Sequence, residues 1–188
     1  MKSQRHLRSL ATAWLLSAFL FTLPSFAQTP PPAPPVDMTP RKVTIDGAEL
    51  YAVGFDKLSS FPYTIVDAGT GATPEEIKAA MAKDQVPPAI RLYHGQRVVL
   101  TGYLMPLAIE NGLTKKFVIM KDVNTCCYGS VPNMNDYVVV TMKGAGITPI
   151  QDVPVDLIGT FRIEQKYEGG YVVSLFAFDG EKFLGAKK

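Results

Sequence analysis

The chain has 188 residues, with 19 Lys and Arg against 17 Asp and Glu. Three of the basic residues and none of the acidic ones lie in residues 1–27, so the rest of the chain has 16 basic and 17 acidic residues, a net charge of −1. A nearly neutral chain lacks the basic surface that is typical of nucleic-acid binders. We therefore expect no nucleic-acid partner.

Residues 1–27 have the composition of a secretory signal. A basic start is followed by an uncharged apolar run over residues 10–21, which is shorter than the ~20 residues that span a bilayer. Ser25 and Ala27 then place small side chains at the positions that signal peptidase prefers. We predict cleavage after Ala27, an exported protein that is periplasmic or secreted, and no transmembrane segment in the mature chain. An uncleaved membrane anchor is the alternative.

The mature chain is predicted to consist of a linker and one domain. Residues 28–41 are rich in proline, which favours an extended polyproline II spacer without a core. Residues 42–188 have the length of a single domain.

The first part of this domain contains one clear helix. Residues 43–55 indicate a weak hairpin or strand, with Asp46-Gly47 as its turn signal. Thr73 is a good N-cap, Pro74 suits the first helical position and Glu76 completes a capping box, so we predict a helix over residues 74–83.

From residue 97 onward, the pattern changes from helical to extended. Turn signals such as Asn111-Gly112 separate short stretches rich in β-branched and aromatic residues, which predict five strands: residues 97–105, 116–121, 137–142, 155–164 and 171–178. We predict a mainly β fold, a small five-stranded OB-like barrel with one N-terminal helix. That helix and the segment before it are expected to cover the outside of the barrel.

The mature chain contains two cysteines, Cys126 and Cys127, and one histidine, His94. This composition excludes a single-chain zinc site of four cysteines or of two cysteines and two histidines. The sequence also lacks the G-x-S-x-G, H-E-x-x-H and Walker motifs. We therefore expect a binding or accessory protein rather than an enzyme.

The adjacent cysteines have three interpretations. First, they form a vicinal disulfide, which would be strained because neighbouring Cα atoms are ~3.8 Å apart; such a bond is a plausible redox switch. Second, they are ligands of a soft metal, Zn or Cu(I). Third, both are small buried apolar residues in a structural or interaction domain.

The metal hypothesis needs further ligands from this chain or from a second protein. The candidates are His94, Asp122, Asp136 and the thioether of Met134. His94 precedes Gly95 at a predicted turn, which favours a turn-stabilising role over a ligand role. Residues 133–136 indicate a turn, in which Asn133, Asn135 and Asp136 would orient the cysteine loop.

Several motifs, taken together, resemble a family of secreted bacterial proteins, domain of unknown function 3299. The resemblance covers roughly residues 50–180 and rests on residues 88–91, 94–98, 102–107, 117–119, 126–129, 132–133, 135 and 153–159. One branch of that family has Cys-x-His-x-Pro-Pro where this chain has Cys126-Cys127-Tyr128-Gly129, so Tyr128 stands in place of a histidine. The loop is also similar to one in a permease-subunit family that ends in an OB-like domain.

The resemblance implies no assigned activity. It implies an OB-like domain and a partner among envelope transport or metal-homeostasis components. The residues that it carries over are Cys126 and Cys127, with Asn133 and Asn135 orienting the loop.

Overall fold

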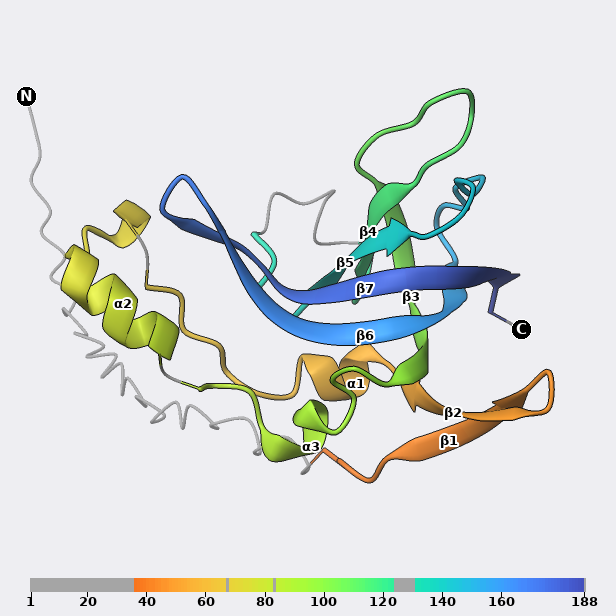
Figure 1. Ribbon diagram of the computed structural model, residues 1–188, viewed down its shortest axis with the longest axis horizontal. Coiled ribbons are helices and arrows are strands. Elements are labelled where there is room, and N and C mark those ends of the chain that lie inside the picture. Colours follow the sequence, from red (N-terminus) through yellow and green to blue (C-terminus); the bar gives the residue numbers. More distant parts are fainter. Residues whose placement is uncertain (1–35, 67, 83, 124–130, 188) are drawn as a thin grey trace, which may run out of the picture. The chain divides into compact units, whose positions relative to one another are not determined.

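Most of the secondary structure in the computed structural model is strand (Figure 1). The structure describes residues 36–66, 68–82, 84–123 and 131–187. The predicted signal, most of the predicted linker and the cysteine pair lie outside these residues. The elements of the described part are β1 (Arg41–Ile45), β2 (Ala48–Val53), α1 (Phe55–Leu58), a 3-10 turn (Ala68–Thr70), α2 (Pro74–Ala82), α3 (Pro88–Arg91), β3 (Arg97–Pro106), β4 (Lys116–Met120), β5 (Tyr137–Met142), β6 (Pro154–Glu168) and β7 (Tyr171–Ala186).

The seven described strands form one sheet in which β3 has neighbours on both sides. β3 pairs with β4, β4 with β5, β5 with β7 and β7 with β6, and β6 in turn pairs with β3. All of these pairings are antiparallel except β5 with β7. The β1–β2 hairpin is attached through a short parallel pairing of β2 with β3. The prediction of a mainly β domain is confirmed.

The five predicted strands from residue 97 onward all form, and the last two are longer than predicted. β6 continues to Glu168 with alternating exposed and half-buried side chains, as expected for a hairpin strand with one covered face. β7 passes through Asp179 and Gly180, which resemble a strand end in sequence. It continues because its pairing with β6 extends past Gly180 to Ala186. Gly180 is accommodated there because it packs against Met142, where a Cβ would lie 2.4 Å from the sulfur.

The helices differ from the prediction of a single N-terminal helix. The predicted capping box is present at the start of α2: the Thr73 N–H donates to the Glu76 carboxylate at 2.7 Å, and the Glu76 N–H donates to the Thr73 hydroxyl at 3.3 Å. The four-residue helices α1 and α3 were not predicted, because neither begins with a side-chain cap.

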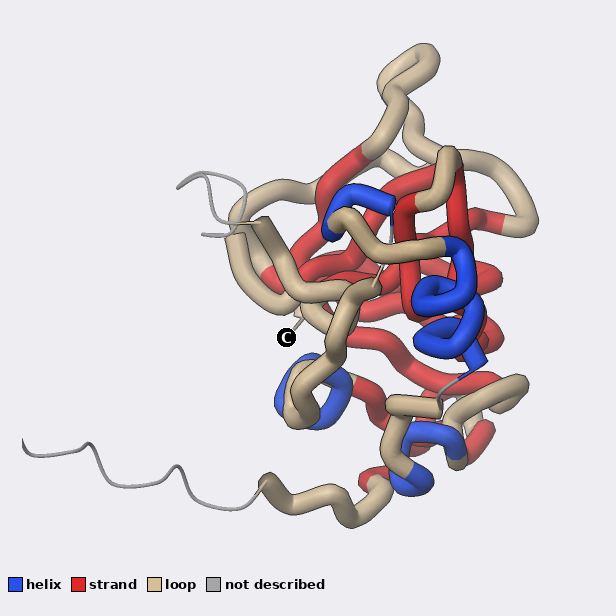
Figure 2. Tube along the Cα trace, turned by 90° about the vertical axis from the view of Figure 1, so that its left-hand side faces the viewer, coloured by secondary structure: helices blue, strands red, loops and turns tan. Residues whose placement is uncertain are grey.

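The predicted cover is formed mainly by the segment before α2, in which Phe61 and Tyr63 pack against the core, and less by α2 itself. Most of its described side chains are exposed, whereas α1 and α3 bury Phe55, Leu58 and Ile90 in the core. Figure 2, viewed from the side of α2, shows the helices and their loops in front of the strands.

One large apolar cluster fills the space enclosed by the paired strands. It takes side chains from every strand of the ring, including Leu100, Ile119, Val140, Phe161 and Phe178. A small second cluster of Leu50, Val99 and Ile158 attaches the β1–β2 hairpin to the outer side of β3 and β6. The core therefore fixes β3 and β4 firmly, and β4 leads directly into the cysteine loop.

Candidate functional site

The connection between β4 and β5 contains Cys126 and Cys127, and residues 124–130 lie outside the described part of the chain. Its two ends are described. β4 and β5 pair up to Met120 and Tyr137, and the Asp136 carbonyl then accepts a hydrogen bond from the Lys121 N–H at 3.0 Å. The loop therefore begins and ends at neighbouring positions of one antiparallel pair.

Asn133 and Asp136 form the turn that was predicted at the exit of the loop. The Asp136 carboxylate accepts from the Asn133 side-chain amide at 2.8 Å and from its backbone N–H at 3.2 Å, and Lys121 lies 3.7 Å away. Burial raises the pKa of Asp136, but hydrogen bonds from Ser59 and Asn133 and the charge of Lys121 outweigh it, so the pKa is lowered. Asp136 is thus an ionised carboxylate whose oxygens already have donors.

Asn135 connects the loop exit to a distant segment. Its side chain is 3% exposed, and its amide donates to the Phe61 carbonyl at 2.7 Å. The Ser59 hydroxyl donates in turn to the Asn135 carbonyl at 3.1 Å. The segment after α1 therefore holds the loop exit in place, which a turn prediction from residues 133–136 does not include.

Met134 lies on the same turn as these residues. The Tyr137 hydroxyl is 3.0 Å from the Met134 sulfur and 3.0 Å from the Val173 carbonyl. The thioether is therefore already in a polar contact within the fold.

His94 is exposed and is bound to β6. Its Nδ1 accepts a hydrogen bond from the Ile163 N–H at 3.0 Å, and the neighbouring Gly95 N–H donates to the Phe161 carbonyl at 2.8 Å. These bonds support a turn-stabilising role and leave only Nε2 of the imidazole for another partner. Within the described ranges, no three His, Cys, Asp or Glu side chains lie close enough together to hold a metal ion. The structure therefore does not bring His94, Asp122 and Asp136 together.

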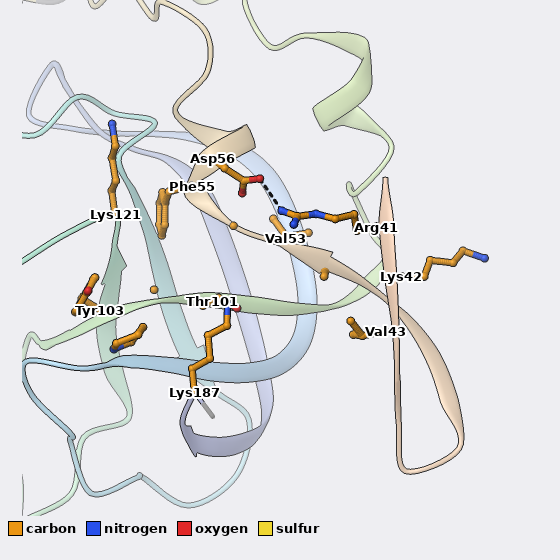
Figure 3. A pocket seen from close by; sticks show the side chains of 14 residues that line it. Arg41, Lys42, Val43, Val53, Phe55, Asp56, Thr101, Tyr103, Lys121 and Lys187 are labelled. Atoms are coloured by element: carbon orange, nitrogen blue, oxygen red, sulfur yellow. Dashed lines mark hydrogen bonds and ion pairs between the residues drawn. The ribbon is translucent and has the colours of Figure 1, made fainter. Parts of the chain in front are cut away.

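A cleft of about 680 Å³ lies beside the start of the loop, with Lys121 on its rim (Figure 3). The hairpin, the start of α1 and the middle of β3 enclose it, and Val53, Phe55 and Gly102 contribute apolar lining. At Gly102 a Cβ would lie 2.5 Å from an Ile119 methyl group, so glycine is required for the close approach of β3 to its neighbours.

Charged side chains line the same cleft. Arg41 forms an ion pair with Asp56 at 2.7 Å across one side. In Figure 3, Lys187 extends toward Thr101, whereas Lys42 points away from the cleft. Sequence reasoning missed this cleft, because Arg41 and Lys187 come from opposite ends of the domain and no local pattern connects them.

No helix in the described ranges is long and apolar enough to cross a membrane. Neither a protein-family model nor a curated protein matches the sequence.

The structure is similar to the crystal structure of a DUF3299 family protein, PA4066, from Pseudomonas aeruginosa PAO1. The TM-score is 0.50 and the sequence identity 19%, and the likeness covers 74% of this chain and 97% of the other. At this identity the likeness concerns the fold alone. A protein of the family that the sequence motifs resemble thus has a fold similar to that of this chain.

Proposed function

We propose that this protein is an exported accessory module that binds a soft metal ion, Zn or Cu(I), through Cys126 and Cys127. The observation that supports the proposal is the fixed base of the loop. Lys121, Asn133, Asn135 and Asp136 hold the two ends of a connection that contains all the cysteines of the mature chain. The two ends of the connection are therefore held at neighbouring positions of the β4–β5 pair.

We further propose that the ring of pairings from β3 to β6 is an OB-like barrel. Two features support it: the strand order β3-β4-β5-β7-β6 with a return pairing to β3, and the parallel pairing of β5 with β7 among the otherwise antiparallel described pairs of this ring. On this barrel, the cysteine loop connects the second and third strands.

Two thiolates do not complete a metal site. The His94 and Asp136 side chains are already hydrogen-bonded elsewhere, and Met134 contacts Tyr137. The remaining ligands are therefore expected from a second protein, which fits an accessory role beside an envelope transport or metal-homeostasis component. Thiolate ligands favour Zn and Cu(I) over hard cations.

The metal proposal is tested on protein purified from the periplasm. We expect bound Zn or Cu(I), measured by elemental analysis and competitive chelator titration, and loss of that binding in the double variant Cys126→Ser/Cys127→Ser. Met134→Leu is the control and is expected to keep the metal. Equal metal binding by the wild type and the double serine variant would refute the proposal.

A redox role is the second candidate, since an exported chain with one adjacent cysteine pair has no other intrachain disulfide to form. Thiol alkylation followed by intact-mass measurement separates the three interpretations. Alkylation that occurs only after mild reduction indicates a disulfide switch. Alkylation of the folded protein that is prevented by bound metal indicates a metal site. Reaction only after unfolding indicates a buried structural pair.

A further inference from the structure

The connection between β3 and β4 ends in a rigid, apolar tip. Asn111 and Gly112 have positive φ angles of 51° and 77°, and Glu110 and Leu113 exchange backbone hydrogen bonds of 2.8 and 3.0 Å across them. Thr114 exchanges two further backbone hydrogen bonds with Ile147, both 2.9 Å. Figure 1 shows this connection extending beyond the sheet.

Exposed aliphatic side chains are concentrated on this tip. Leu107, Ile109 and Leu113 are 50%, 54% and 40% exposed, and Met105 just before them is 36% exposed. These four are among the eleven large apolar side chains that are exposed in the described part of the chain, and they lie within nine consecutive residues. Such a concentration of apolar surface is typical of an interaction site, whereas single exposed leucines are ordinary.

Lysines lie directly behind the apolar tip. Lys115 and Lys116 form no ion pair with any described residue, while Lys143 pairs with Glu181 at 3.4 Å. A cleft of about 310 Å³ beside the tip is lined by Leu113, both lysines and Gly146. Two acidic side chains partly offset the charge of these lysines: Glu110 on the tip, and Glu168, whose carboxylate interacts electrostatically with Lys116.

We propose that this tip, residues 107–116, binds the surface of an anionic phospholipid bilayer. The aliphatic side chains enter the boundary between headgroups and acyl chains, and Lys115 and Lys116 contact the lipid phosphates beside them. Apolar insertion combined with nearby lysines is the pattern of interfacial membrane binding. A projecting tip without aromatic or arginine side chains lacks the anchors that dominate protein–protein interfaces.

The proposal is tested by sedimentation of the purified chain from Gln28 onward with sucrose-loaded vesicles. We expect binding to phosphatidylcholine vesicles that contain 30% phosphatidylglycerol, and much weaker binding to pure phosphatidylcholine. Lys115→Gln/Lys116→Gln is expected to lower the partition coefficient about 25-fold at low salt, about fivefold for each lysine. Ile109→Ser/Leu113→Ser is expected to lower it at least tenfold on both kinds of vesicle, and Glu110→Gln to raise it on the anionic ones.

The matched control is Leu92→Ser/Tyr171→Ser, which removes side chains that are 57% and 50% exposed outside the tip. We expect this variant to bind as the wild type does. An equal loss in the control, unchanged binding in Ile109→Ser/Leu113→Ser, or no sedimentation of the wild type with either vesicle would overturn the proposal. Because all the substituted side chains are exposed, the thermal unfolding of each variant is expected to match that of the wild type.

Discussion

At the scale of single residues, Asn135 and Asp136 have the most contacts at the base of the cysteine loop. Their backbone groups bond to Ser59 and Lys121, and their side chains bond to Phe61 and Asn133. They therefore connect the start of β5 to the end of β4 and to the segment after α1. Any change in these contacts should be measurable as a change in stability.

Asn135→Ala is expected to lower the free energy of unfolding by about 1–3 kcal/mol, because it removes a buried amide and leaves the half-buried Phe61 carbonyl without its donor. Urea denaturation with fluorescence detection measures this. Asn133→Ala is the control: its side chain is exposed and the variant should lose less than about 1 kcal/mol. Equal losses in the two variants would contradict a special role for Asn135.

Asp136 gives a prediction about pH. Its pKa is lowered in the folded protein, so the ionised carboxylate stabilises the fold above the unfolded pKa of about 4. This contribution is lost as the pH falls through the lower folded pKa. Wild type is expected to be more stable than Asp136→Asn at pH 7, and the difference should shrink steadily below pH 4, which denaturation at several pH values will show. A difference that is independent of pH would indicate that the charge is unimportant.

The sequence predicted these residues only in part. Asn and Asp over residues 133–136 indicated the turn, and Asn133 and Asp136 do form it. The burial of Asn135 could not be predicted, because its partners Ser59 and Phe61 lie more than 70 positions earlier in the chain. Turn chemistry is local, whereas the burial of a polar side chain depends on contacts that only the fold creates.

At the scale of elements, β3 organises the sheet, because it pairs with β2, β4 and β6. Its middle residue, Gly102, has Phe55 and Ile119 side-chain atoms and the Met120 carbonyl within 2.7 Å of the position of a Cβ. β3 can therefore pass between α1 and β4 only without a side chain at this position.

Gly102→Ala is expected to lower the free energy of unfolding by about 1–3 kcal/mol, since the methyl group must displace Phe55, Ile119 or the backbone of β4. The matched control is Gly144→Ala, where nothing lies within 4 Å of the added Cβ and the loss should be close to zero. Thermal and urea denaturation of both variants provide the comparison. If the two variants were equally stable, the close contact at Gly102 would not be important.

Elements with local signals were predicted well, and those formed by tertiary contacts were not. The capping box of Thr73 and Glu76 and the turn at Asn111-Gly112 both form as predicted. The helices α1 and α3 have only four residues each and no capping side chain, so the buried Phe55 and Ile90 stabilise them instead. Four residues are too few to show a helical period in the sequence, although Pro88 suits the first position of α3.

At the scale of the whole molecule, the two proposed sites lie at the two ends of β4. The proposed membrane tip ends at Lys116, the first residue of β4, and the cysteine loop follows Met120, its last. A strand of this length spans roughly 15 Å. If both proposals hold, the loop leaves the domain at the end of β4 that points away from the bilayer.

Export gives a prediction for the entire chain. Expression in a bacterial host should yield a periplasmic protein whose intact mass begins at Gln28, because Ser25 and Ala27 suit signal peptidase. Ala27→Arg should block processing and leave the full-length chain, whereas Ala33→Arg in the linker should not. Recovery of uncleaved wild-type protein from the cytoplasm would contradict the predicted export.

The overall strand order was also only partly predictable. Five strands and their turns followed from the sequence, but the return pairing of β6 with β3 joins Arg97 to Thr160 and Tyr103 to Pro154. The cleft lined by Arg41 and Lys187 likewise depends on residues that are far apart in the sequence. Such long-range pairs leave no periodic trace in the sequence.

The pairing of β3 with β6 also has a kinetic consequence. The register of β3 is completed only by residues 154–160, so most of the chain must be synthesised before this strand has all its partners. Domains dominated by such distant pairings fold slowly, on a scale of milliseconds to seconds. A chain that folds late remains extended for longer, and we expect this delay to give an exported polypeptide time to pass through a narrow translocation channel before its sheet closes.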